Sequence, residues 1–314
     1  MGTPDFAAQI LKGLIDDPDI EVRCVYTQPD RPAGRGKKLL PPPVKVLAEG
    51  AGLHVRQPLT LKDEEEQAIL RSFCPDFLIV AAYGMLLPQS VLDIPALAPI
   101  NIHTSLLPKY RGCAPVQRAL MDGDEVTGVS IMRMEAGLDT GPVYASSSLP
   151  TAGETAGSLL DKMAGRSLPL LKEVLTGVLN GALTPVPQAG ESSYAGKIAK
   201  AEGLIDVYRP VRVVDCHIRA VTPDPGAHVT LCLEKGEVTV VLEKVHPVSA
   251  EGKPGQVLTR KGHLLLACSG GCLEVERLRP QGKKSMDVAS FLNGQRLCSS
   301  ELLVSGTVKP AAGM

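Results

Sequence analysis

Tryptophan is absent from this chain of 314 residues, and aromatic residues make up only 3% of it. Leu, Val, Ile and Ala must therefore supply most of the apolar area that the protein buries. Charge is nearly balanced, with 33 Lys and Arg against 34 Asp and Glu, so the chain as a whole exerts no bulk attraction on nucleic acid. Any site for a polyanion must be a local cluster of basic side chains.

Long apolar runs, metal-ligand spacings and a phosphate-binding loop are also missing. No apolar stretch reaches the length of a transmembrane helix. The eight cysteines are scattered, and the one close pair, Cys268 and Cys272, has no second pair to complete a zinc site. The Gly-x-x-x-x-Gly-Lys-Ser/Thr spacing of nucleotide hydrolases does not occur. We expect a cytoplasmic protein with reduced thiols that does not bind a membrane.

The length of the sequence and the change in its pattern of predicted elements along the chain indicate two domains. In the first part, predicted strands alternate with predicted helices, and the apolar run over 76–82 is typical of a parallel strand buried on both faces. This pattern predicts an α/β domain with an open, mostly parallel, Rossmann-like sheet and helices on both faces. Ligands of such sheets bind at the carboxyl ends of the strands, and the predicted strand over 99–103 ends at a cluster of polar side chains.

The second part of the chain contains short alternating segments separated by Gly-containing turns. We predict strands over 228–233, 238–245, 255–259, 264–267 and 272–278, and a helix over 213–220. These elements favour a small OB-like β-barrel. The predicted organisation is a catalytic domain over 1–181, a linker over 182–201, a barrel over 202–298 and a tail over 299–314.

Three polar residues suit the transfer of an acyl group between two nitrogens. Asn101 and His103 are two apart on the predicted strand, so they point to the same side, and Asp139 lies in the Gly-bounded segment 137–141. The reaction passes through a tetrahedral intermediate, which requires hydrogen-bond donors at the developing oxyanion. Asn101 and His103 can supply these donors, and Asp139 can orient the imidazole and pass a proton through water. A local hydrogen-bonding or capping pair is the structural alternative for Asn101 and His103.

The amino-acid sequence around these residues favours the catalytic interpretation. The segment Asn101–Gly112, continued by 114–118, 128–132 and 137–141, resembles the formyltransferases that use 10-formyltetrahydrofolate, and the closest resemblance is to the methionyl-tRNA formyltransferases. The resemblance implies that Asn101, His103 and Asp139 are catalytic. No metal is needed, because the formyl amide of the donor is already activated and the site supplies the hydrogen-bond donors. The resemblance also implies that 10-formyltetrahydrofolate is the co-substrate.

The folate-binding segment implied by the same resemblance directly follows the catalytic histidine. It consists of Ser105, Leu106, Leu107 and Pro108. Thr104 departs from the family pattern, which has a smaller residue such as Gly or Ala at this position. The apolar run ending in 80–85 would form another wall of the folate cleft, although for Val80 and Ala81 packing in the core is the alternative.

A basic, Pro- and Gly-rich stretch over 28–43 distinguishes between possible substrates. Clustered Arg and Lys side chains on an exposed irregular loop can lie along a phosphate backbone, and a solvated basic loop is the alternative. The stretch resembles the insertion by which methionyl-tRNA formyltransferases bind the acceptor stem of initiator tRNA. The residues expected to contact tRNA are Arg31, Arg35, Lys37 and Lys38.

The sequence departs from the family pattern at its start and in its C-terminal part. In the family a β-strand leads into the turn that Gly2–Phe6 would form, so we expect that the sequence lacks its first strand and that the chain is destabilised. In the C-terminal part, 279–286 and 291–294 resemble the family signature, whereas Asp224 replaces a Trp.

The sequence therefore predicts an enzyme that transfers the formyl group of 10-formyltetrahydrofolate to methionyl initiator tRNA for translation initiation. We expect a monomer whose partners are this tRNA and the folate. Two alternatives remain: a formyltransferase for a small amine, such as a sugar nucleotide or glycinamide ribonucleotide, or a non-catalytic protein that binds folate or RNA.

Overall fold

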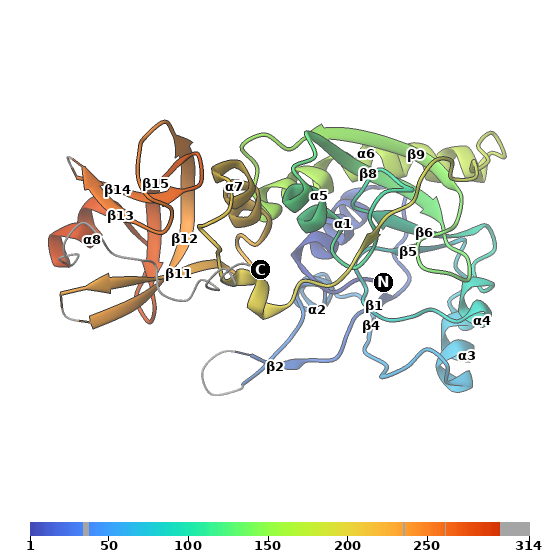
Figure 1. Ribbon diagram of the computed structural model, residues 1–314. Coiled ribbons are helices and arrows are strands. Elements are labelled where there is room, and N and C mark those ends of the chain that lie inside the picture. Colours follow the sequence, from blue (N-terminus) through green and yellow to red (C-terminus); the bar gives the residue numbers. More distant parts are fainter. Residues whose placement is uncertain (34–37, 235, 261, 296–314) are drawn as a thin grey trace. The chain divides into compact units, whose positions relative to one another are not determined.

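The computed structural model describes residues 1–33, 38–234, 236–260 and 262–295. The chain divides into two compact units, drawn as ribbons in Figure 1. Unit 1 comprises Met1–Pro115, Val126–Pro150 and Leu160–Gly196, and unit 2 comprises Val116–Glu125, Thr151–Leu159 and the chain from Lys197 onward. Among the described residues, we find no helix whose length and apolar character would let it span a lipid bilayer.

Unit 1 is a mixed α/β structure whose longer helices are amphipathic. Its helices are α1 (Asp5–Asp16), α2 (Pro43–Gly50), α3 (Glu64–Ser72), α4 (Gln89–Leu92) and, apart from its first turn, α6 (Ala156–Leu179). In α1 the side chains of Phe6, Ile10 and Leu14 are buried, and their spacing of four residues places them on one face. The sequence patterns predict four helices here, over about 6–15, 44–50, 62–72 and 155–178. All four are confirmed, with end points that differ by at most two residues.

The strands of unit 1 form a four-stranded sheet and several strand pairs. They are β1 (Val25–Tyr26), β2 (Arg31–Ala33), β3 (Lys38–Leu40), β4 (Val55–Arg56), β5 (Phe77–Val80), β6 (Ala98–His103), β7 (Arg111–Gly112), β8 (Val126–Arg133), β9 (Val143–Pro150) and β10 (Tyr194–Ala195). The four-stranded sheet has the order β5-β6-β8-β9, in which β5 and β6 are parallel and the other two pairings are antiparallel (Figure 1).

The parallel sheet predicted for the first domain is thus only partly present. The pairs β1–β4 and β5–β6 are parallel, whereas β8 and β9 are joined by a loop too short for a helical crossover and pair antiparallel. The alternating segment 20–26 of the sequence predicts a strand of seven residues. The strand observed is limited to Val25 and Tyr26, because only these two residues pair with β4. Strand β6 extends over 98–103, which confirms the strand predicted over 99–103.

Strands β1 and β5 lie in different sheets, and the first two residues pass between them. The amide of Gly2 donates to the carbonyl of Tyr26 at 3.0 Å, and the amide of Ala81 donates to the carbonyl of Met1 at 2.9 Å. A cavity of about 630 Å³ adjoins this contact and is lined by residues of α1, β1 and β5. Val80 and Ala81 are buried, which confirms the packing interpretation for these two residues.

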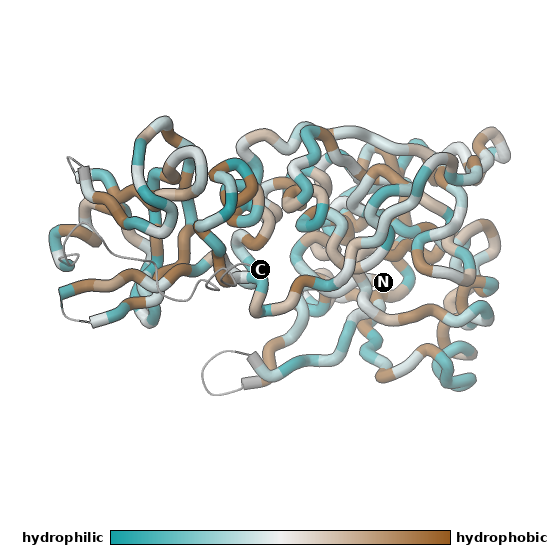
Figure 2. Tube along the Cα trace, in the orientation of Figure 1, coloured by the Kyte–Doolittle hydropathy of each residue, from teal (hydrophilic) through white to brown (hydrophobic). Residues whose placement is uncertain are grey.

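Unit 2 is built around a curled antiparallel sheet. Its strands are β11 (Ala227–Leu233), β12 (Gly236–Val248), β13 (Val257–Arg260), β14 (His263–Cys268), β15 (Gly271–Pro280) and β16 (Met286–Asp287). The sheet has the order β11-β12-β15-β14-β13, with β16 on β15. Every second residue of β11 is buried, and Figure 2 shows brown apolar residues along these strands. The five strands predicted here are confirmed, and they form a curled antiparallel half-barrel, which bears out in part the small OB-like barrel that we expected.

Unit 2 also contains short helices, of which the last two pack against this sheet. They are α5 (Pro115–Asp122), the 3-10 helix η1 (Lys200–Gly203), α7 (Val211–Ala220) and α8 (Val288–Gly294). The guanidinium of Arg118 on α5 binds both carboxylate oxygens of Glu202 on η1, at 2.6 and 3.1 Å. This bidentate pair joins α5 to η1 within unit 2.

A half-buried ion pair in unit 1 makes a testable contribution to stability. The guanidinium of Arg56 donates to the Glu66 carboxylate at 2.6 and 3.1 Å, and these bonds hold the pKa of Glu66 below its ordinary value of 4.5. Glu66→Gln should therefore lower the free energy of unfolding at pH 7 by about 1–3 kcal/mol. A carboxylate with a lowered pKa stabilises the fold above its ordinary pKa. The difference from the wild type should thus shrink as the pH falls below 4.5.

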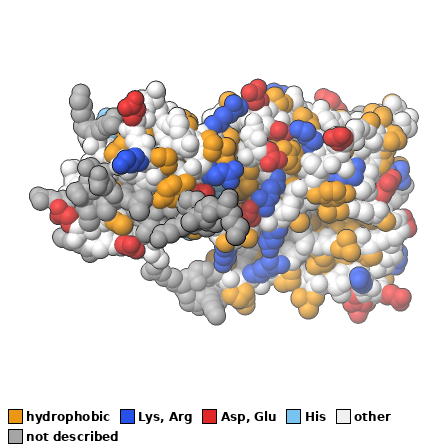
Figure 3. Space-filling view, in the orientation of Figure 1, with side chains coloured by type: hydrophobic (Ala, Val, Ile, Leu, Met, Phe, Trp, Pro, Cys, Tyr) orange, Lys and Arg blue, Asp and Glu red, His pale blue; other side chains and the backbone are white. Residues whose placement is uncertain are grey.

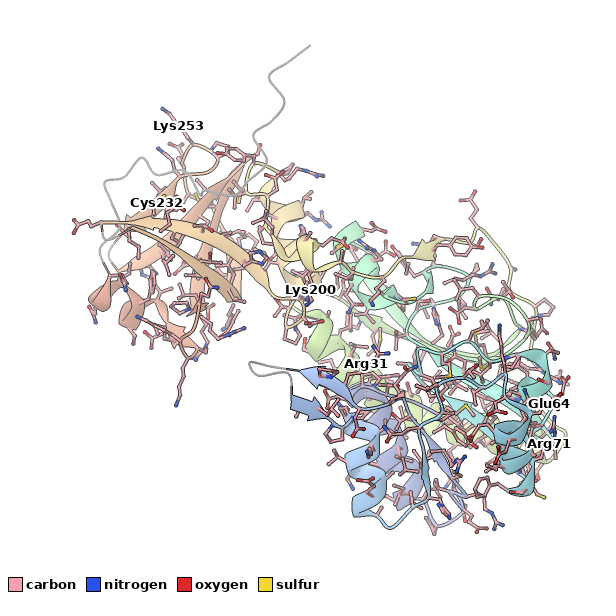
Figure 4. The ribbon with its side chains drawn as sticks, turned by 90° about the horizontal axis from the view of Figure 1, so that it is seen from below. Arg31, Glu64, Arg71, Lys200, Cys232 and Lys253 are labelled. Atoms are coloured by element: carbon pink, nitrogen blue, oxygen red, sulfur yellow. The ribbon has the colours of Figure 1, made fainter. Side chains whose placement is uncertain are left out.

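Urea unfolding curves between pH 3 and pH 7 test this expectation. Glu64→Gln is the matched control, because Glu64 lies on the exposed side of the same helix (Figure 4) and should change the stability by less than about 0.5 kcal/mol. Equal effects of the two substitutions at pH 7 would contradict a role for the Arg56–Glu66 pair.

Candidate active site

Strand β6 carries the first two predicted site residues to the same place. Asn101 and His103 lie at the carboxyl end of this strand, where Asn101 is opposite Met132 and His103 is opposite Ser130 of β8. Because the two residues are separated by one position in a strand, their side chains leave the sheet on the same side. Asn101 is half-buried and His103 is 5% exposed.

The carboxylate of Asp139 meets both of these side chains. The amide nitrogen of Asn101 donates to Oδ1 of Asp139 at 3.3 Å, and Nδ1 of His103 lies 3.7 Å from Oδ2. The backbone amide of Gly112 also donates to Oδ2, at 2.8 Å. The structure therefore brings together the three residues that the sequence predicts to be catalytic, and it adds a backbone donor that holds the carboxylate.

The orientation of the His103 ring follows from its second nitrogen. Nε2 lies 2.9 Å from the carbonyl oxygen of Tyr110. A carbonyl oxygen only accepts, so Nε2 carries the hydrogen of this bond. Nδ1 is therefore the nitrogen that faces Asp139, and a proton can be held between the imidazole and the carboxylate.

The backbone of Asp139 has an unusual conformation, with φ at +52°. Few residues adopt this left-handed region, and Asp is among those that tolerate it. Gly141 follows at a position where a Cβ would collide with the carbonyl oxygen of Arg133. The segment 137–141 thus has a defined shape that depends on its Gly residues and that aims the carboxylate toward β6.

The predicted folate segment, Ser105–Pro108, is anchored beside His103. The hydroxyl of Ser130 donates to the carbonyl of Ser105 at 2.8 Å and accepts from the amide of Leu107 at 3.2 Å. Leu106, Leu107 and Pro108 are half-buried and present apolar surface. Thr104 is half-buried as well, so its extra bulk is accommodated at the edge of the site.

The basic stretch forms a strand pair where we expected an irregular loop. Strands β2 and β3 pair antiparallel, with Arg31 opposite Leu40. Arg31 is exposed and donates to the Gln28 side chain at 2.9 Å, and Figure 4 shows it on β2. Arg35 and Lys37 lie outside the described residues. Lys38 belongs to β3, but its side chain also lies outside the description.

Thiols and metal-ligand groups provide no second candidate site in the described part of the chain. The seven cysteines that the structure describes are free thiols, and no group of three or more His, Cys, Asp or Glu residues in this part could hold a metal ion. The cavity beside Met1 contains none of the three predicted catalytic residues. The convergence of Asn101, His103 and Asp139 is therefore the arrangement with the clearest chemistry.

Comparison with known proteins agrees with this arrangement. The model of the family described as "Formyl transferase" matches residues 1–175, and that of "Formyl transferase, C-terminal domain" matches residues 197–296. The chain belongs to the formyl transferase family. The resemblance on which the sequence interpretation depends is thereby confirmed.

Relatives place the chain more narrowly within this family, and a solved structure shares its fold. It is 44% identical to the methionyl-tRNA formyltransferase of Halorhodospira halophila over 96% of each chain, and 47% identical to that of Dechloromonas aromatica over 94% of this chain and 95% of the relative. A Helicobacter canadensis N-formyltransferase, solved with folinic acid and dTDP-3-aminofucose, is 17% identical with a TM-score of 0.61. That match covers 87% of this chain and 96% of the solved one. The solved structure shows a shared fold.

Several groups in the site were not predicted from the sequence. The carbonyl of Tyr110 and the amide of Gly112 act through the backbone, so their side-chain types gave no signal. The hydroxyl of Ser130 lies in a motif that the sequence analysis singled out, but its role as an anchor depends on strand pairing. Gln188 contacts the Asp139 loop from a segment that the sequence predicted to be a linker.

Proposed function

We propose that this protein transfers the formyl group of 10-formyltetrahydrofolate to the α-amino group of methionyl initiator tRNA, a reaction that serves translation initiation. The observation that carries the proposal is the convergence of Asn101, His103 and Asp139 within 3.7 Å. Membership of the formyl transferase family and full-length relatives named methionyl-tRNA formyltransferase support it.

Asn101 stabilises the oxygen of the formyl group in this mechanism. Its side-chain amide has two hydrogens, of which one is directed to Oδ1 of Asp139. The second hydrogen is available for the formyl oxygen, which becomes negative when the amine attacks. Because Asp139 fixes the amide, this donor is oriented before the reaction begins.

His103 and Asp139 move the proton. The attacking amine loses a proton as the new carbon–nitrogen bond forms, and the N10 nitrogen of tetrahydrofolate gains a proton as the old bond breaks. Nδ1 of His103 and Oδ2 of Asp139 face each other across 3.7 Å, so this pair can accept the first proton and return it. The Tyr110 carbonyl holds the ring in place through Nε2.

The segment Ser105–Pro108 fits the folate that supplies the activated formyl amide. Its apolar side chains are half-buried beside the buried His103 ring, and Ser130 holds its backbone. Leu138, adjacent to Asp139, is 55% exposed and offers a second apolar surface. These residues would hold the flat ring system of a folate with its formyl nitrogen near Asn101.

The tRNA would bind to local basic surface. On the face shown in Figure 3, Lys and Arg side chains stand among Asp and Glu side chains, in agreement with the net charge of −1. A polyanion therefore requires a cluster such as the one around β2 and β3. The proposal assigns Arg31, Arg35, Lys37 and Lys38 to this contact.

Replacing these four residues with Ala should weaken binding of methionyl-tRNA while leaving folate affinity unchanged. Each phosphate contact that is lost should reduce the slope of log K against log salt concentration by roughly 0.7–0.9. Filter binding at four salt concentrations measures this slope. The control replaces four exposed basic residues elsewhere in unit 1, namely Lys12, Lys62, Arg71 and Arg166. The assignment is wrong if both variants bind with the same affinity and slope.

We assign a separate function to each predicted domain. Residues 1–181 would perform the chemistry, 182–201 would connect the two domains, and 202–298 would form an OB-like barrel that contributes to tRNA binding. The family models, which match 1–175 and 197–296, support these limits. We further assign the protein a monomeric state and a cytoplasmic location, where translation begins.

A competition among amines tests the proposed substrate. Purified protein and 10-formyltetrahydrofolate are mixed with methionyl initiator tRNA, methionyl elongator tRNA, free methionine, an amino-sugar nucleotide or glycinamide ribonucleotide, and initial rates of formylation are compared. We expect the initiator tRNA to have the highest kcat/KM. A higher value for a small amine, or no formylation of any acceptor, would overturn the proposal.

A further inference from the structure

A segment that we predicted to be a linker contacts two segments of the active site. These are the segment 137–141, which contains Asp139, and the segment Arg111–Gly112. Residues 186–195 of the predicted linker, in yellow in Figure 1, are bound at each end. Val186 exchanges two backbone hydrogen bonds of 2.8 Å with Val143 of β9, and Tyr194–Ala195 pair with Arg111–Gly112 as β10 and β7. We call the residues 186–195 the strap.

Gln188 on the strap binds the backbone of the Asp139 loop at two carbonyl groups. Its amide nitrogen donates to the carbonyl of Asp139 at 2.8 Å and to the carbonyl of Gly141 at 2.7 Å. Both hydrogens of the amide are therefore used. These carbonyls belong to the segment that contains the left-handed Asp139 residue, with φ at +52°, whose conformation needs such support.

The oxygen of the same amide connects Gln188 to the opposite loop. It accepts from Nε and Nη2 of Arg111 at 3.1 and 2.6 Å. The next residue, Gly112, donates its backbone amide to Oδ2 of Asp139 at 2.8 Å. Gln188 and the Arg111–Gly112 pair thus hold Asp139 from two directions, one through its backbone and the other through its carboxylate.

We propose that Gln188 is a positioning residue that keeps the Asp139 carboxylate facing Asn101 and His103. This inference rests on the proposed function, since it assigns Gln188 a role in the same reaction. Gln188 itself touches no reacting atom. Its chemistry is specific because two donors and one acceptor are required at once, and among neutral side chains of this length only an amide provides them.

Gln188→Glu removes the two hydrogen bonds that the Gln188 amide donates and keeps the two that its oxygen accepts. The substitution keeps the size of the side chain and its contact with Arg111, but it places carboxylate oxygens against two carbonyl oxygens. A small displacement of a catalytic group has a large effect on rate. We therefore expect kcat to fall about 10- to 100-fold, whereas KM for the folate and for methionyl-tRNA changes less than about threefold. Gln9→Glu, the same substitution at an exposed position of α1, should leave both constants unchanged.

The loss of kcat caused by Gln188→Glu should be much smaller when Asp139 has already been replaced. In an Asp139→Asn background we expect Gln188→Glu to reduce the residual rate less than about threefold, because a residue that acts through Asp139 has nothing further to misplace. A merely structural role predicts the same 10- to 100-fold loss in both backgrounds, and that outcome would overturn the proposal. Unchanged kcat in Gln188→Glu would also overturn it.

Hydrogen exchange separates this inference from the proposed function. In Gln188→Glu the amide of Gly112 should exchange at least tenfold faster than in the wild type, measured by mass spectrometry on the free protein without any substrate. Unchanged exchange at Gly112 contradicts the positioning role even if the enzyme formylates methionyl-tRNA. Faster exchange in a protein that formylates no acceptor leaves the role of Gln188 in holding the loop intact and rejects the proposed function alone.

Discussion

His103→Ala should reduce kcat for formyl transfer by about 10²–10⁴-fold, the usual contribution of a general acid–base residue. The imidazole is the only group that places a titratable nitrogen opposite the Asp139 carboxylate, so no neighbour in the described site replaces it. Folate affinity should remain within about threefold, because Ser130, and not His103, anchors the Ser105–Pro108 segment. Single-turnover rates and equilibrium binding of a folate analogue measure the two quantities separately.

Two further variants keep this expectation falsifiable. Removal of the ring takes away the hydrogen bond that Nε2 donates to the Tyr110 carbonyl, which costs about 0.5–1.5 kcal/mol of stability. His103→Gln provides a side-chain amide for that carbonyl but no group that takes up a proton, so it should fold more stably and remain equally inactive. His54→Ala, at an exposed position in the same unit, is the control. Near-normal turnover in His103→Gln would contradict the mechanism.

Asp139→Asn should lower kcat by about 10²–10³-fold with little change in stability. Asn has the same size, tolerates the same positive φ, and can still accept the hydrogen bond from Gly112. It lacks the negative charge that faces Nδ1 of His103, so it cannot hold the proton that the attacking amine releases. Steady-state kinetics with saturating folate give kcat, and thermal unfolding gives the stability.

The control for this second variant is Asp16→Asn, which removes a carboxylate from an exposed position of α1. It should alter neither kcat nor the melting temperature by more than the experimental error. If Asp139→Asn retains more than a tenth of the wild-type kcat, Asp139 is a structural residue and the proton pathway through it is wrong. If Asp139→Asn unfolds, Asp139→Glu serves as the second variant, because it keeps the charge and should recover part of the rate.

The relative positions of residues close together in the sequence were predictable, because they depend on a single strand or helix. The alternation over 99–103 predicts that Asn101 and His103 point together, and β6 does this. The apolar period over 155–178 predicts α6. Both features follow from backbone geometry alone. Contact of Asp139 with these residues was predictable only from the family resemblance, because it depends on how β8 and its loop pack.

Features that depend on pairing between distant segments were not predictable. The alternation over 20–26 suggests a strand of seven residues, but only Val25 and Tyr26 have a partner in β4. The strap contains Pro and Gly, which are typical of linkers, and its order comes from partners such as Asp139 and Arg111 that lie far away in the sequence. Side-chain patterns contain no information about a carbonyl such as that of Tyr110.

The most direct test of the account is the single-turnover rate of formyl transfer in His103→Ala, Asp139→Asn and the double variant. Residues that act as one unit give losses that do not multiply. The account predicts that the double variant is no more than about threefold slower than the slower single variant. Losses that multiply in the double variant would show that His103 and Asp139 act independently and would contradict the account.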